Sequence, residues 1–70
     1  MCNTHIGKHI REYREASGMS QLELSLEVGI EQSNISHYEC GVRLPNIETL
    51  VKIADIFGLK LWAFLKEIDV

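Results

Sequence analysis

The sequence has few cysteines, no long apolar run and no excess of positive charge. Cys2 and Cys40 are its only cysteines. They are too few and too irregularly spaced for a disulfide framework or a four-ligand zinc site, so free reduced thiols are expected. No apolar run approaches the ~18 residues that span a bilayer, and the first residues lack the apolar core of a signal peptide. We therefore expect a cytoplasmic protein.

The chain is also short and uniform in composition. Its 70 residues, 46% of them hydrophobic, suffice for one small core but not for a second, ligand-sensing domain. It contains no alternating strand pattern, Gly/Ser-rich linker, repeat or low-complexity tract. We therefore assign residues 1–70 to a single domain.

The net charge of −3 counts against nucleic-acid binding, because phosphate neutralisation normally leaves a basic footprint. The charges are nevertheless unevenly distributed. Cations lie on either side of the central segment, at Lys8, Arg11, Arg14 and Arg43, and carboxylates occupy the last third, at Glu48, Asp55, Glu67 and Asp69. This distribution predicts a basic face and an acidic far side.

Apolar residues recur at three- and four-residue steps in five segments, which indicates five short helices. Ser20 and Glu23 have the spacing of a capping box, and Asn46 is placed to cap a later helix. The helices are predicted to begin near Ile6, Ser20, Gln32, Asn46 and Leu61, and to end near Ser17, Gly29, Glu39, Gly58 and Ile68. The predicted fold class is an all-α, compact five-helix bundle.

The most informative segment is 19–39, MSQLELSLEVGIEQSNISHYE. It reads as two short helices joined by a tight turn at Gly29-Ile30, with small polar side chains at the start of the second helix. A helix held at a steep angle to its predecessor can enter the DNA major groove with its first turn facing base edges. The spacing therefore predicts sequence-specific DNA binding.

These residues resemble the lambda-repressor-like, Cro/CI-type helix-turn-helix domains, also called the XRE family. The resemblance covers roughly residues 6–65, and several motifs agree in register. Matching stretches include Tyr13-Arg14, Gly18-Met19-Ser20-Gln21, Val28-Gly29-Ile30, Gln32-Ser33-Asn34-Ile35-Ser36 and Arg43-Leu44-Pro45. The resemblance implies a helix-turn-helix unit at about 20–39. The second helix of this unit, which is the third helix of the fold at about 32–39, is the recognition helix.

The resemblance also implies which residues read DNA. Gln21 is expected to contact the DNA backbone and to brace Gln32, the first side chain of the recognition helix. Gln can bond adenine through N6 and N7 together, so Gln32 is the main candidate for base readout. The remaining DNA-contact candidates are Ser33, Ser36 and His37 along the exposed face, and Asn34 and Arg43 at phosphates.

A structural ion pair between Arg14 and Glu39 is implied by the same resemblance, and we expect it to set the angle of the recognition helix. Glu31 departs from the family, which prefers Ser, Thr or Asp as the cap before this helix. Ser25 stands where Ala is customary, a change that the contact between helices should tolerate.

Leu22 and Leu26 are one turn apart and are expected to face outward, since Leu24 and Val28 supply the inward face. In family activators this surface can contact RNA polymerase, usually through acidic side chains. Two interpretations are open: a contact site for RNA polymerase or another protein, and a broad core stripe or harmless exposed leucines.

Leu61, Trp62 and Ile68 make the last helix more apolar than a monomer of this size needs. Because the family binds pseudo-palindromic sites as two-fold dimers, these residues form one candidate dimer interface. The alternative, at even odds, is that Trp62 closes the core.

Cys2, His5 and His9 have a spacing that could converge on a metal, but three ligands at a chain end form a weak signal. The favoured interpretation is that they are solvated residues on a helix face, so no metal and no cofactor are expected.

The leading hypothesis is a dimeric repressor or restriction-modification controller that binds a pseudo-palindromic operator. The alternative is a protein-interaction module on the same fold, such as an antitoxin or a regulator subunit. An enzyme is not expected, because no acid-base or nucleophile constellation is visible in the sequence.

Overall fold

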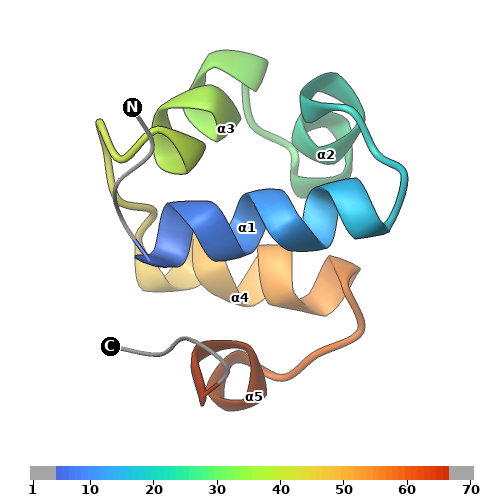
Figure 1. Ribbon diagram of the computed structural model, residues 1–70, viewed down its shortest axis with the longest axis vertical. Coiled ribbons are helices and arrows are strands. Elements are labelled where there is room, and N and C mark those ends of the chain that lie inside the picture. The colour runs from blue at the N-terminus through green and yellow to red at the C-terminus, as the bar shows by residue number, and fades with distance from the viewer. Residues whose placement is uncertain (1–4, 67–70) are drawn as a thin grey trace.

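Five helices follow one another along residues 5–66, the part of the chain that the computed structural model describes (Figure 1). They are α1 (His5–Ala16), α2 (Gln21–Val28), α3 (Gln32–Glu39), α4 (Ile47–Ile56) and α5 (Leu61–Lys66). No strand occurs in this range, so the predicted all-α, five-helix fold is confirmed. None of these helices is long and apolar enough to cross a membrane.

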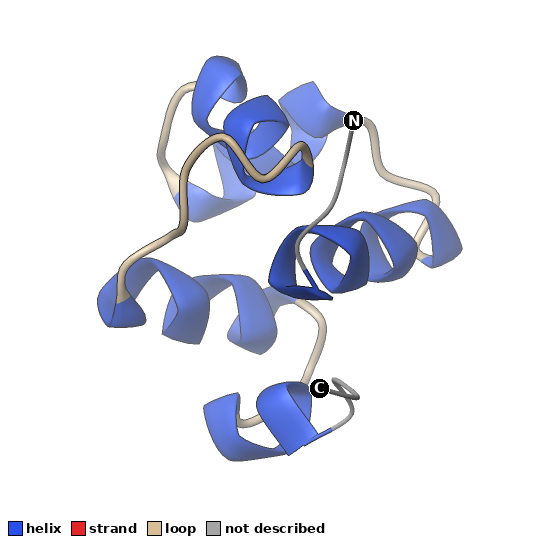
Figure 2. Ribbon diagram, turned by 60° about the vertical axis from the view of Figure 1, so that its left-hand side comes forward, coloured by secondary structure: helices blue, strands red, loops and turns tan. Residues whose placement is uncertain are grey.

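The helices form three tiers that two views of the molecule show alike (Figures 1 and 2). Helices α2 and α3 lie together at one end, α1 and α4 occupy the middle, and α5 lies at the opposite end. Helix α3 packs against both α2 and α1, and α4 packs against α2 and α5. In the helix-turn-helix pair, α3 therefore rests on α1 and α2 rests on α4.

Side-chain caps define the starts of α2 and α4, but not that of α3. The Ser20 hydroxyl accepts from the Glu23 backbone N–H at 3.0 Å, and the Ser20 N–H donates to the Glu23 carboxylate at 2.8 Å, which confirms the predicted capping box. Asn46 caps α4 by accepting from the Thr49 N–H at 2.8 Å. Glu31 sits at the N-cap of α3 but makes no side-chain cap hydrogen bond.

The turn between α2 and α3 depends on Gly29, whose φ of +87° lies in the left-handed region that side chains with a Cβ avoid. The Ser25 carbonyl accepts from both the Gly29 and the Ile30 N–H, at 2.8 and 3.0 Å, and so ends α2. The Ser25 hydroxyl is buried and donates to the Leu22 carbonyl at 2.6 Å. This bond explains how a polar side chain is accommodated where the family has alanine.

One hydrophobic core joins all five helices. Its buried members are Ile10, Leu24, Val28, Ile35, Tyr38, Leu50, Ile53, Ala54 and Phe64. Ile35 and Tyr38 anchor α3 to this core through one side of the helix. Because successive side chains turn by about 100° around a helix, the first turn of α3 presents other residues to solvent.

The two kinds of cap give a matched stability prediction. Asn46→Ala should lower the free energy of unfolding by about 1 kcal/mol, since it removes the acceptor for the Thr49 N–H. Glu31→Ala, at a cap that makes no such bond, should change it by less than about 0.5 kcal/mol. Urea unfolding followed by circular dichroism measures both, and equal losses at the two positions would contradict this account of the helix ends.

Candidate nucleic-acid interface

The first turn of α3 is exposed at its leading residues. Gln32 and Ser33 are exposed, whereas Asn34 and Ser36 are half-buried, and the opposite side of α3 faces the core. An exposed amide side by side with a hydroxyl offers both hydrogen-bond donors and acceptors to a ligand. The turn thus has the chemistry needed to contact base edges or phosphates.

A buried carboxylate at the other end of α3 fixes its position. Glu39 is 2% exposed, and its two oxygens accept from the Arg14 guanidinium at 2.7 Å (Nε to Oε2) and 3.2 Å (Nη2 to Oε1). The third Arg14 nitrogen, Nη1, donates to the Met19 carbonyl at 2.8 Å. Arg14 therefore ties α1 both to the end of α3 and to the start of the segment that leads into α2.

The Gln21 side chain completes this network. Its Nε2 donates to Glu39 Oε1 at 3.1 Å, which links the first residue of α2 to the last residue of α3. We expected Gln21 to brace Gln32, but the described residues show no hydrogen bond between those two amides. A hydrogen bond from a further donor to a buried carboxylate is more stabilising than a hydrogen bond between two neutral amides. In this structure Gln21 therefore braces the body of α3 through Glu39.

Arg43 lies just beyond α3 and is exposed. The loop that carries it folds back on the helix, because the His37 carbonyl accepts from the Val42 and Arg43 N–H groups at 3.0 and 3.3 Å. These bonds hold the Arg43 backbone beside the C-terminal end of α3. Arg43 therefore starts from the end of α3, and its side chain is accessible to an anion.

His37 departs from its expected place on a fully exposed face. It is half-buried, and its Nδ1 is buried without a hydrogen-bond partner in the structure. The folded-back loop approaches α3 at this residue, as the two bonds to its carbonyl show. His37 is thus partly enclosed by its own chain.

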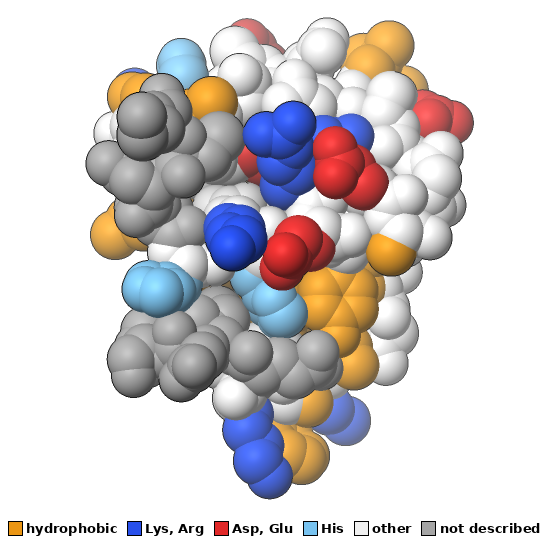
Figure 3. All heavy atoms as spheres, viewed as in Figure 1, with side chains coloured by type: hydrophobic (Ala, Val, Ile, Leu, Met, Phe, Trp, Pro, Cys, Tyr) orange, Lys and Arg blue, Asp and Glu red, His pale blue; other side chains and the backbone are white. Residues whose placement is uncertain are grey.

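The expected basic face is interrupted by acidic partners. Arg14 has a side chain only 12% exposed and is bonded to Glu39, and Arg11 Nε lies 3.3 Å from Glu15 Oε2. Basic and acidic side chains accordingly lie side by side over α1 in the space-filling view (Figure 3). Sequence position alone could not show this, because it does not reveal which cations are paired.

The apolar residues singled out on α2 and α5 are at the surface. Leu22 and Leu26 are both exposed, which confirms that they face outward. Trp62 is 67% exposed, so the interpretation that it closes the core is wrong. Phe64 fills that role, at 0% exposure, while Leu61 is half-buried and Ile68 lies outside the described residues.

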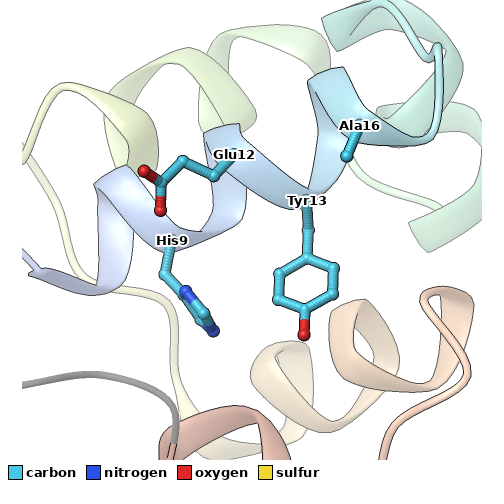
Figure 4. A pocket seen from close by; sticks show the side chains of 4 residues that line it. All are labelled: His9, Glu12, Tyr13 and Ala16. Atoms are coloured by element: carbon cyan, nitrogen blue, oxygen red, sulfur yellow. The ribbon is translucent and has the colours of Figure 1, made fainter.

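His9 does not lie on a solvated helix face as expected. Its ring packs against Tyr13 and Phe64 at centroid distances of 4.9 and 4.6 Å, and its Nε2 is buried without a hydrogen-bond partner. His9 and Tyr13 extend from α1 to the same side, where they line a shallow pocket of about 260 Å³ with Glu12 and Ala16 (Figure 4). The four-residue spacing of His9 and Tyr13 was the available sequence signal for this contact.

The described residues bring together no group of three His, Cys, Asp or Glu side chains that could hold a metal. His5 is exposed at the start of α1, and Cys2 lies outside the described residues. The sequence-based candidate ligands are therefore not assembled into a site by residues 5–66.

Comparison with known proteins shows what this arrangement is similar to. A family model described as helix-turn-helix matches residues 10–61. The endothelial differentiation-related factor 1 homolog of Xenopus laevis is 38% identical over 56 residues, which cover 80% of this chain but only 38% of that protein. This chain thus spans less than half the length of the Xenopus relative.

Two solved structures share the fold over most of their length. The restriction-modification controller protein C.AhdI from Aeromonas hydrophila superposes with a TM-score of 0.80 at 27% identity, over 86% of this chain and 91% of that one. The N-terminal DNA-binding domain of SinR from Bacillus subtilis gives 0.81 at 30% identity, over 91% and 96%. These matches confirm the family resemblance inferred from the sequence.

The Glu39 network gives a second matched prediction. Arg14→Met should lower the free energy of unfolding by about 3–5 kcal/mol, because it leaves a buried carboxylate without its charged partner. Arg11→Met removes an exposed pair on the same helix and should cost less than about 1 kcal/mol. Denaturant unfolding at low temperature provides the measurement. A small loss for Arg14→Met, similar to that of Arg11→Met, would show that Glu39 is not a structural centre.

Proposed function

The chain belongs to the helix-turn-helix family, and from this premise we propose that it is a sequence-specific DNA-binding transcriptional regulator. Its form is that of a dimeric repressor or restriction-modification controller that binds a pseudo-palindromic operator. The observation that carries this proposal is the exposed first turn of α3, held by Glu39 against Arg14 and Gln21. The similarity to a restriction-modification controller and to a DNA-binding domain supports it.

In this proposal Gln32 reads sequence from the major groove. Its exposed amide can donate to adenine N7 and accept from adenine N6, a bidentate contact that other bases do not match. Ser33 contacts a base edge or phosphate beside it, and Ser36 and His37 contribute further along the helix. Their partial burial limits Ser36 and His37 to shorter reach than Gln32.

Asn34 and Arg43 hold the duplex by its phosphates. Arg43 supplies the cation, and its place beyond the end of α3 puts it on the flank of the groove that α3 would occupy. Gln21 is half-buried, and a phosphate contact from it would compete with its bond to Glu39. With so few free cations near α3, non-specific attraction to DNA is weak and base contacts supply a large share of the affinity.

The size of the domain supports a homodimer on a pseudo-palindromic operator. Its longest extent is 26 Å, whereas half-sites one helical turn apart are separated by about 34 Å. One domain therefore reaches one half-site, and a pseudo-palindrome needs two. We place one dimer contact at Trp62 and Leu61 of α5, because Trp62 is exposed and apolar. Ile68, the third residue of this proposed contact, lies outside the described residues. We further propose a cytoplasmic location and no catalytic activity.

A second function is favoured by one specific observation. Leu22 and Leu26 form an exposed apolar pair on α2, as would suit a protein-interaction module, an antitoxin or regulator subunit, or a contact with RNA polymerase. Binding to a mixed DNA pool separates the two functions. A regulator binds the pool at low salt and releases it as salt rises, whereas no binding at low salt favours the interaction module.

Two substitutions on and beside α3 should affect DNA binding differently. Gln32→Ala should remove about 1–3 kcal/mol of discrimination at one base pair of the preferred site while leaving the salt dependence unchanged. Arg43→Ala should weaken binding to all sequences alike and reduce the salt slope by about one. Titrations with the preferred site and single-base variants, at several salt concentrations, measure both. If Gln32→Ala keeps full discrimination at every position, Gln32 is not the base reader.

The dimer contact at α5 has its own test. Trp62→Ala should weaken dimerisation by about 2 kcal/mol, the loss typical of a buried interface tryptophan. Leu26→Ala, at an equally exposed apolar residue on α2, serves as the control and should leave the dimer unchanged. Sedimentation equilibrium measures the dissociation constant, and an unaltered dimer in Trp62→Ala refutes the assignment.

A further inference from the structure

Helix α4 exposes an apolar pair that the core does not use. Ile47 is 64% and Val51 45% exposed, although the same helix buries Leu50, Ile53 and Ala54. Residues four apart lie on one face of a helix with Cβ atoms about 5–6 Å apart, so Ile47 and Val51 form a continuous strip. Both side chains are β-branched and compact, which allows another helix to approach closely.

Charged side chains of opposite sign follow the two members of this strip. Glu48 comes directly after Ile47, and Lys52 directly after Val51, so both lie on the same flank of the strip. Both are exposed, and neither takes part in an ion pair within residues 5–66. Their charges are thus available to an outside partner. We call the apolar residues Ile47 and Val51, together with the flanking Glu48 and Lys52, the α4 strip.

We propose that the α4 strip packs against the α4 strip of a second copy of this chain, with the two helices antiparallel about a two-fold axis. The inference rests on the dimer proposed above and adds a second surface, on α4, to the contact already proposed at Trp62 and Leu61 of α5. In an antiparallel pair, Ile47 faces Val51 of the second copy and Val51 faces its Ile47. On the flank, Glu48 faces Lys52 of the second copy, and the symmetry forms this ion pair twice.

A second exposed apolar pair, on α2, shows why charge decides between partners. Leu22 and Leu26 on α2 have the same four-residue spacing, but Glu23 and Glu27 follow them. Antiparallel packing of two α2 helices would bring these carboxylates face to face, which is repulsive. The α4 strip is complementary to itself, and the α2 pair is not.

The α4 strip lies on the helix that follows the proposed recognition helix, α3. Only residues 40–46 separate α3 from α4, and that loop is bonded back onto α3 at the His37 carbonyl. A contact through α4 therefore holds the two recognition helices of the dimer at a fixed separation. Half-site spacing then becomes a property of the α4 contact.

Charge reversal tests this contact in the intact chain. Glu48→Lys places two lysines opposite two lysines across the axis, and Lys52→Glu places glutamates opposite glutamates. Each variant alone should raise the dimer dissociation constant at least about tenfold, since two pairs change from attraction to repulsion. An equimolar mixture of the two should regain the wild-type dissociation constant, because each lysine then meets a glutamate. The double variant Glu48→Lys/Lys52→Glu should regain it in a single chain.

The measurement is sedimentation equilibrium without DNA, with thermal melts to show that every variant remains folded. Glu27→Lys on α2 is the matched control and should not change the dissociation constant. The proposal would be overturned if the single variants dimerise like the wild type, or if their mixture does not regain the wild-type dissociation constant. It would also be overturned if the wild-type chain stays monomeric or if a different protein covers the α4 strip. Binding to one isolated half-site is measured separately. If the monomeric variants still bind the half-site, the proposed DNA binding stands whatever the dimer does. If the wild type does not bind it, the proposed DNA binding is contradicted.

Discussion

The carboxylate of Glu39 is the point on which the position of the recognition helix depends. It lies at the last residue of α3 and accepts hydrogen bonds from Arg14 on α1 and Gln21 on α2. A charge buried to this degree is costly unless every oxygen is satisfied, so few orientations of the three helices are compatible with it. Such an interaction contributes more to the geometry of α3 than to net stability.

Fixing α3 in this way turns one cation, Arg14, away from DNA. Of the other residues expected to form a basic face, Arg11 lies against Glu15, whereas Lys8 on α1 and Arg43 beyond α3 are exposed. Weak general attraction makes base contacts and the pairing of two subunits more important for affinity. The acidic net charge is therefore compatible with DNA binding when two recognition helices act together.

Local chemistry made much of the fold predictable, whereas long-range pairing did not. The capping box at Ser20 and the glycine at position 29 act within a few residues, so spacing alone located them. The partner of Gln21 depends on how α2 meets α3, which residue spacing does not show. The prediction that His9 lies on a solvated helix face was wrong because its neighbour Phe64 is distant in sequence. At the candidate site, residue identity was predictable and degree of burial was not.

Selection of bound sequences from a random double-stranded DNA library tests the central claim most directly. If α3 reads bases and two copies act together, the selected sequences should contain two related half-sites in two-fold symmetry, with centres about one helical turn apart. A half-site enriched in adenine at one position would agree with Gln32 as the reader. A library that remains random after repeated selection at low salt would contradict the account, because the exposed turn of α3 would then have a different partner.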